Sequence, residues 1–270
     1  MPPFLPSFLS SFRRPGRALA AIAFTVSLSA LCLAPAISHA QTFSDSQRNE
    51  IEGILKNYLV AHPELLEEMS AELTKRQAAA ETAKHEAAVK KDAETIFNSP
   101  RGVVVGNRSG DVTFVEFFDY NCGYCKHAMS DMLDLMKSDS KLRVVLKEFP
   151  VLGPGSVEAA QVAVAVRMQD PNGKKYLDFH QKLLGGRGQA DKARAMAAAK
   201  DAGLDMARLE KDMQSPEVKA TLEENFKLAE NMGLNGTPSY VIGNQVVVGA
   251  VGLEDLSKRI SEARCGKASC

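Results

Sequence analysis

The segment FVEFFDYNCGYCK, residues 114–126, decides how the rest of the chain is interpreted. Its first half belongs to a near-continuous apolar and β-branched run, residues 112–118, which is typical of a buried central strand. Two cysteines follow, and a helix is predicted to start around Cys122 and to run to about residue 136. The segment therefore predicts a C-x-x-C pair, Cys122 and Cys125, at the N-terminus of a helix.

This placement favours thiol chemistry. Unpaired backbone N–H groups and the helix dipole stabilise a thiolate at Cys122, and such positions bring cysteine pKa values down to about 3.5–7.5. Cys125, one turn later, can then resolve a mixed disulfide. A structural zinc site is disfavoured because it needs four ligands. Capture of Cu(I) by Cys122 and Cys125 stays open, because thiolates suit that soft ion. No cofactor other than the redox-active pair is expected.

Glu116 is the one acidic residue in the otherwise apolar strand 112–118. Burial would raise its pKa, and a buried carboxyl near the resolving thiol can exchange a proton with it. Lys147, in the strand predicted over 142–149, is the candidate partner for Glu116. Two alternatives remain: Glu116 points to solvent at a sheet edge, or Lys147 is an unrelated surface residue.

The N-terminal segment predicts an exported protein. Arg13, Arg14 and Arg17, the apolar run 18–33 and the small-residue site 38–40 predict a signal peptide over residues 1–40, cleaved near Ala40. Cleavage would remove Cys32 and leave four cysteines in an oxidising compartment. There Cys265 and Cys270 are expected to form a structural disulfide. A retained membrane anchor and a lipoprotein modified at Cys32 are the alternatives.

Residues 41–99 are predicted to be an N-terminal helical segment. A capping box at residues 44–47 precedes a short helix that is expected to bury apolar side chains, and no Gly or Pro occurs from Glu64 to about Phe97. A narrow apolar seam within this second helix predicts a stalk that pairs with copies of itself. The alternatives are that the helix folds back onto the catalytic domain or is a partly frayed linker. The apolar positions are Ile51, Ile54, Leu55 and Tyr58 in the first helix, and Leu66, Met69, Leu73, Ala80, Ala83 and Ala87 in the second.

Residues 100–270 read as one α/β domain. The predicted order is strand, strand, helix, strand, a helical insertion over about 156–233, a two-stranded hairpin and a closing helix. The 33 basic and 33 acidic residues give a net charge of zero, which argues against a nucleic-acid partner.

Three segments together resemble the DsbA-type thiol–disulfide oxidoreductases: residues 114–126, KEFPVLG at 147–153 and GTPSY at 236–240. The resemblance implies a thioredoxin fold with a helical insertion. It also implies that Pro238 is cis and that the Thr237 backbone holds substrate beside Cys122 as an added strand.

The resemblance further implies that Gly123 and Tyr124 face the substrate, with Glu116 as the buried acid and Lys147 as its neighbour. Residues 44–66 resemble the oligomerising extension of the suppressor-of-copper-sensitivity (ScsC) group. This implies a homo-oligomer, either a dimer or a trimer.

Differences from DsbA itself indicate whether the chain oxidises, reduces or isomerises disulfides. Gly123-Tyr124 replaces the Pro-His of DsbA-type oxidases, whereas disulfide isomerases of the DsbC type carry Gly-Tyr and a Thr before the cis-proline. These features and the N-terminal extension favour a periplasmic isomerase or reductase. Its partners would be misfolded or reduced exported proteins and a membrane thiol reductant. The alternatives are a DsbA-type oxidase recharged by a membrane oxidant, and a copper(I)-binding or chaperone-like module.

Overall fold

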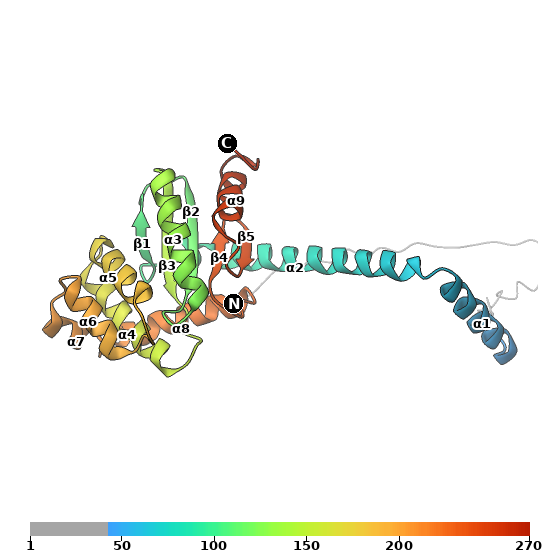
Figure 1. The fold of residues 1–270 in the computed structure, drawn as a ribbon, viewed down its shortest axis with the longest axis horizontal. Coiled ribbons are helices and arrows are strands. Elements are labelled where there is room, and N and C mark those ends of the chain that lie inside the picture. Colours follow the sequence, from blue (N-terminus) through green and yellow to red (C-terminus); the bar gives the residue numbers. More distant parts are fainter. Residues whose placement is uncertain (1–42) are drawn as a thin grey trace, which may run out of the picture. The chain divides into compact units, whose positions relative to one another are not determined.

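The computed structural model describes residues 43–270 and divides the chain into two units, Met1–His62 and Pro63–Cys270. The predicted signal peptide, residues 1–40, lies outside the described residues. Helix α1, Asp45–Ala61, belongs to the first unit, and all other described helices and strands belong to the second (Figure 1).

Helix α1 begins as its sequence predicts. The Ser44 hydroxyl accepts a hydrogen bond from the Gln47 N–H, and the Gln47 side chain accepts one from the Ser44 N–H. The expected burial of its apolar residues is wrong for the single chain, because α1 has no buried residue. Those residues, all more than a third exposed, are Ile51, Ile54, Leu55 and Tyr58.

Helix α2, Glu64–Asn98, has two different halves. Leu66, Met69 and Leu73, on the apolar seam of its first half, are 63%, 62% and 57% exposed. Val89 and Ile96, in contrast, are buried in a core shared with the sheet and α8. The predicted domain boundary at residues 99–100 is therefore not a packing boundary, because the end of α2 supplies part of the core of the catalytic domain.

The second unit is built on a five-stranded sheet in the order β1-β3-β2-β4-β5. Strands β2 and β3 are parallel, and the other pairs are antiparallel. The central position of β2 explains its apolar sequence, because both of its faces are covered. The strands are β1 Val103–Gly106, β2 Val112–Phe118, β3 Leu142–Glu148, β4 Ser239–Ile242 and β5 Gln245–Val248.

Helices cover both faces of the sheet. Helices α3, Gly123–Ser138, and α9, Leu253–Cys265, pack on one face, and α2 and α8 pack on the other (Figure 1). Between β3 and β4 the chain forms the expected helical insertion. Its helices are α4 Pro154–Gln169, α5 Lys174–Gly185, α6 Lys192–Asp201, α7 Met206–Asp212 and α8 Pro216–Asn231. The predicted thioredoxin fold with a helical insertion is confirmed.

Candidate active site

Cys122 is the N-cap residue of α3. Its backbone is extended, and its Sγ accepts a hydrogen bond of 3.2 Å from the Cys125 N–H. The Sγ also lies 3.2 Å from the Thr237 carbonyl oxygen, to which the thiol can donate. Hydrogen bonds from the Cys125 thiol and from the first backbone N–H groups of α3 stabilise the thiolate and lower the pKa of Cys122 to about 6, although burial opposes them. The thiol is therefore largely ionised at neutral pH.

Cys125 has the opposite character, although it lies only one turn away. It is fully buried, and burial together with its hydrogen bond to the Cys122 sulfur raises its pKa well above the usual range. Both thiols are free in the structure. The pair therefore combines one ionised sulfur, which can attack a disulfide, with one thiol that stays protonated until a base takes its proton.

Glu116 lies in the middle of β2, 2% exposed, on the same face of the strand as Phe114 and Phe118. It does not point to solvent at a sheet edge, because β2 is the central strand. Burial, with smaller contributions from Cys122 and Asp131, raises the pKa of Glu116 to about 8. A carboxyl with this pKa can both release and take up a proton near neutral pH.

Lys147 lies on the other face of the sheet, and its predicted pairing with Glu116 is wrong. Lys147 is opposite Phe117 in the β2–β3 register, whereas Glu116 is opposite Leu146, so the two side chains point to opposite faces. The Lys147 ammonium donates to the Thr95 carbonyl at 3.2 Å and lies 3.9 Å from a Glu224 oxygen. Burial lowers the pKa of Lys147 to about 8.

The loop before β4 completes the site. The Thr237–Pro238 peptide bond is cis, as the resemblance implied. Ser239, which follows it, is opposite Phe117 near the C-terminal end of β2. The loop therefore lies at the end of β2 from which the chain continues to Cys122. Tyr124 is 70% exposed at the start of α3. A methyl group added at Gly123 would meet no atom within 4 Å, so Gly123 leaves the approach to Cys122 open.

Two residues of the active-site turn were not predicted. The Asp119 carboxylate accepts hydrogen bonds from the Asn121 N–H and from the N–H groups of residues 151–152, at 2.7 to 2.9 Å. The Asn121 amide donates to Ser156 and exchanges two hydrogen bonds with the Ala190 backbone. The turn before Cys122 is thereby tied to the helical insertion. An Asp-x-Asn after a strand predicts a local turn but does not reveal these distant partners.

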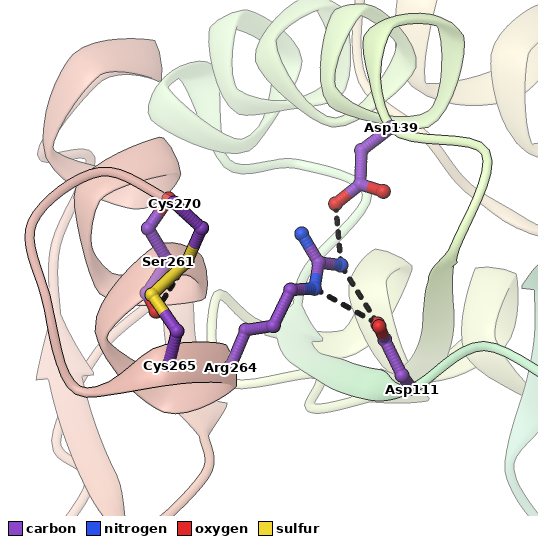
Figure 2. Close-up of a disulfide and its surroundings, with 6 residues drawn as sticks. All are labelled: Asp111, Asp139, Ser261, Arg264, Cys265 and Cys270. Carbon is purple, nitrogen blue, oxygen red and sulfur yellow. Dashed lines mark hydrogen bonds and ion pairs between the residues drawn. A yellow bond between two sulfur atoms is a disulfide. The ribbon is translucent and has the colours of Figure 1, made fainter.

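Cys265 and Cys270 form the expected disulfide at the end of α9 (Figure 2). Next to them, the Arg264 guanidinium pairs with Asp111 at 2.8 Å and with Asp139 at 2.7 Å. These ion pairs join the end of α9 to the turn before β2 and to the end of α3. Over residues 43–270 the structure brings together no group of three or more His, Cys, Asp and Glu side chains that could hold a metal ion.

Comparison with known proteins places this site in a family. The family model described as the DSBA-like thioredoxin domain matches residues 113–261, which include both thiols and the cis-proline. The chain belongs to the DsbA-like thioredoxin family. A second model, the Copper resistance protein ScsC N-terminal domain, matches residues 47–80 of this DsbA-like chain. The expected membership of the DsbA-like family is confirmed, and the N-terminal segment matches the ScsC model as its resemblance implied.

Solved structures that resemble the DsbA-like chain include the following three. A thioredoxin-like oxidoreductase from Silicibacter pomeroyi is 42% identical, with a TM-score of 0.60, over 63% of this chain and 96% of that one. A linker-deletion mutant of Proteus mirabilis ScsC is 26% identical, with a TM-score of 0.62, over 83% and 98%. Salmonella enterica BcfH is 26% identical, with a TM-score of 0.70, over 81% and 96%.

Curated relatives include the Na(+)/H(+) antiporter NhaA of Herminiimonas arsenicoxydans, which is 26% identical over 93% of the DsbA-like chain. The chain spans only 38% of that protein and 25% of the NhaA 1 antiporter of Salinispora arenicola. None of the helices described between residues 43 and 270 has the length and hydropathy that crossing a membrane requires.

Proposed function

We propose that this DsbA-like chain is a periplasmic thiol–disulfide oxidoreductase that isomerises or reduces disulfides in exported proteins as a homo-oligomer. The observation that carries the proposal is the asymmetry of its thiols. Cys122, with its pKa lowered to about 6, lies beside the Thr237 backbone, while Cys125 is buried and protonated behind it. This arrangement suits attack by one sulfur and release by the other.

The reaction follows from this geometry. The Cys122 thiolate attacks one sulfur of a client disulfide; a Cys122–client disulfide forms, the client disulfide breaks, and the departing client thiolate takes a proton. In isomerisation, another client thiolate attacks the client sulfur of this mixed disulfide and regenerates the Cys122 thiolate, with no net change in electrons.

In reduction, Cys125 loses its proton and attacks the Cys122 sulfur. The client leaves as a thiol, and a Cys122–Cys125 disulfide remains, which a membrane dithiol must reduce before the next cycle. The ionised fraction of Glu116, which grows as the pH approaches 8, can take the Cys125 proton. Thr237 offers its backbone to an extended client segment.

The exposed apolar residues of α1 and of the first half of α2 support the oligomer. Leu66, Met69 and Leu73 expose more than half of their surface in a helix without Gly or Pro. A contiguous exposed apolar stripe of this kind is typical of a surface that binds another protein chain. Several active sites around one misfolded client raise the effective concentration of thiol, which isomerisation needs more than oxidation does.

The test compares the chain without residues 1–40 with its Leu66→Glu plus Leu73→Glu variant. Lys75→Glu, a charge change at an exposed position of the same helix, is the control. We expect the double variant to sediment as a monomer and to reactivate scrambled ribonuclease about tenfold more slowly. Reduction of a small disulfide should be unchanged. Full isomerase activity in a monomeric variant would overturn the oligomeric part. A chain that only oxidises reduced ribonuclease would be a DsbA-type oxidase.

Copper is a second candidate function, because the matching N-terminal model is described as that of a copper resistance protein. Cu(I) would bind at Cys122 and Cys125 and compete with exchange. A Cys125→Ala variant that traps exported proteins as mixed disulfides supports the redox function. Stoichiometric Cu(I) binding together with no trapped protein would favour the copper module.

A further inference from the structure

A groove of about 670 Å³ lies beside Cys122. One wall is the active-site turn, residues 120–123, together with Lys126 on α3. The loop 186–189, which follows α5, and Leu152, which follows β3, also line the groove. The attacking sulfur therefore faces the Thr237 loop on one side and this groove on another.

Cationic side chains hold the loop in place. The Lys126 ammonium donates to the Gly186 carbonyl at 2.9 Å. The Arg194 guanidinium donates to the carbonyls of residues 188–189 at 2.6 and 3.1 Å, and it lies so close to Gly186 that a side chain there would clash with it. The loop carries Arg187, which also lines the groove.

These three cations are not neutralised within the described chain. No Asp or Glu lines the groove. Within residues 43–270, Lys126, Arg187 and Arg194 take part in none of the ion pairs. Three acids nearby do not line the groove and keep their charge while they accept backbone hydrogen bonds: Asp119 from residues 121 and 151–152, Asp191 from Arg194, and Glu158 from Lys192. Among the residues that line the groove besides Cys122, the charged side chains are therefore those of Lys126 and Arg187, and both are positive.

We propose that this groove is a client subsite, which selects polypeptide segments that carry an acidic residue close to the reacting cysteine. The inference rests on the proposed function. When a client sulfur is bonded to Cys122, the flanking residues must run past Thr237 or into the groove. Lys126 and Arg187 line the same groove as Cys122, so residues that flank the client cysteine pass these cations when they enter the groove. Leu152 and Leu184 offer that segment an apolar wall.

The test uses the chain without residues 1–40 as a Cys125→Ala variant, so that the reaction stops at the mixed disulfide. Peptides with one cysteine are supplied as mixed disulfides with thionitrobenzoate. Cys122 attacks the peptide sulfur, the Cys122–peptide disulfide forms, and thionitrobenzoate leaves as a coloured anion that reports the rate. One peptide series carries Glu or Gln before the cysteine, and a second carries Glu or Gln after it.

We expect the Glu peptide of one series to react about fivefold faster than its Gln counterpart at low ionic strength, and the ratio to fall in high salt. Adding Lys126→Gln plus Arg187→Gln should bring the ratio close to one. Arg208→Gln plus Lys219→Gln, which removes two cations outside the groove, should leave it unchanged. Because each ratio uses one enzyme variant, a general change in Cys122 reactivity cancels.

Equal rates for Glu and Gln peptides in both series would overturn the subsite, as would a Glu preference that survives Lys126→Gln plus Arg187→Gln. If no peptide releases thionitrobenzoate, Cys122 is not an attacking thiol, and the proposed function fails together with the subsite.

Discussion

One pair of cysteines lies at the N-terminus of α3 and the other at the C-terminus of α9, and the two pairs show how position controls thiol chemistry. Cys122 caps α3 and Cys125 lies in its first turn, just after the central strand β2, and both are buried. Cys265 ends α9 and is bonded to Cys270 in an exposed tail. Both pairs are close in sequence, with two and four intervening residues. Only the first pair lies where free N–H groups point at a sulfur.

The electrostatics of a helix explain the difference. At a helix N-terminus, unpaired N–H groups stabilise a thiolate, whereas at a C-terminus the unpaired carbonyls disfavour one. Gly266, with a positive φ of 73°, ends α9 and turns the chain back, so Cys270 can reach Cys265. The first pair is therefore suited to exchange and the second to closing the tail. Five predictions test this contrast.

The largest effect is expected from Cys122→Ser, which removes the attacking sulfur. Exchange with a peptide disulfide should fall by roughly 10³-fold or more, because no other thiol occupies a helix N-cap in the described chain. Stopped-flow measurement of mixed-disulfide formation checks this. Cys265→Ser plus Cys270→Ser is the matched control and should exchange at the wild-type rate; a similar loss in that variant would break the contrast.

Glu116→Gln should slow the release of client from the mixed disulfide by roughly 10²-fold, because the Cys125 thiol loses its proton acceptor. The first attack, by Cys122, should change little. Comparing formation and decay of a trapped mixed disulfide separates the two steps, and equal slowing of both would place Glu116 outside the resolving step.

The same residue predicts a pH dependence of stability. The pKa of Glu116 is raised to about 8 in the folded chain, so folding keeps a proton that the unfolded chain releases. The stability contributed by Glu116 is fully present below its unfolded pKa and is lost as the pH rises through 8. As the pH rises from the ordinary pKa value of 4.5 to about 8, the wild type should therefore lose free energy of unfolding relative to Glu116→Gln. A difference independent of pH in denaturant titrations would contradict the burial argument.

Alkylation of Cys122 should follow its lowered pKa. Between pH 5 and 7 the thiolate fraction of a group with a pKa of about 6 rises about tenfold, and above pH 7 it stays nearly constant. Iodoacetamide labelling followed by mass spectrometry measures this. A midpoint near the ordinary cysteine value of about 8.5 would show that the N-cap position does not ionise the sulfur.

The smallest effect is expected from removing the tail disulfide. Cys265→Ala plus Cys270→Ala should lower the free energy of unfolding by about 1–2 kcal/mol, because the bond closes only a short loop. Thermal unfolding in the absence of reductant checks this against wild type. Arg264→Gln, which breaks the neighbouring pairs with Asp111 and Asp139, provides a comparison for the contribution of that surface network.

Much of the site could be predicted because its information is local. Strand 112–118 lies where its apolar run predicts, and the helix follows at Cys122. Lys147 shows the limit. Its burial could be suspected from its strand, but its face depends on the register between β2 and β3, and a shift of one residue reverses it.

The sequence by itself determined the two cysteine pairs, the strand-then-helix context of Cys122, and the cis-proline loop through a family resemblance. Each depends on residues that are near neighbours in the chain. Only the tertiary structure decided that Lys147 pairs with Thr95 and Glu224, and that the end of α2 belongs to the core. It also decided that loop 186–189 borders the Cys122 groove. These contacts join segments tens of residues apart, and their geometry is set by how sheet and helices pack, which no local pattern encodes.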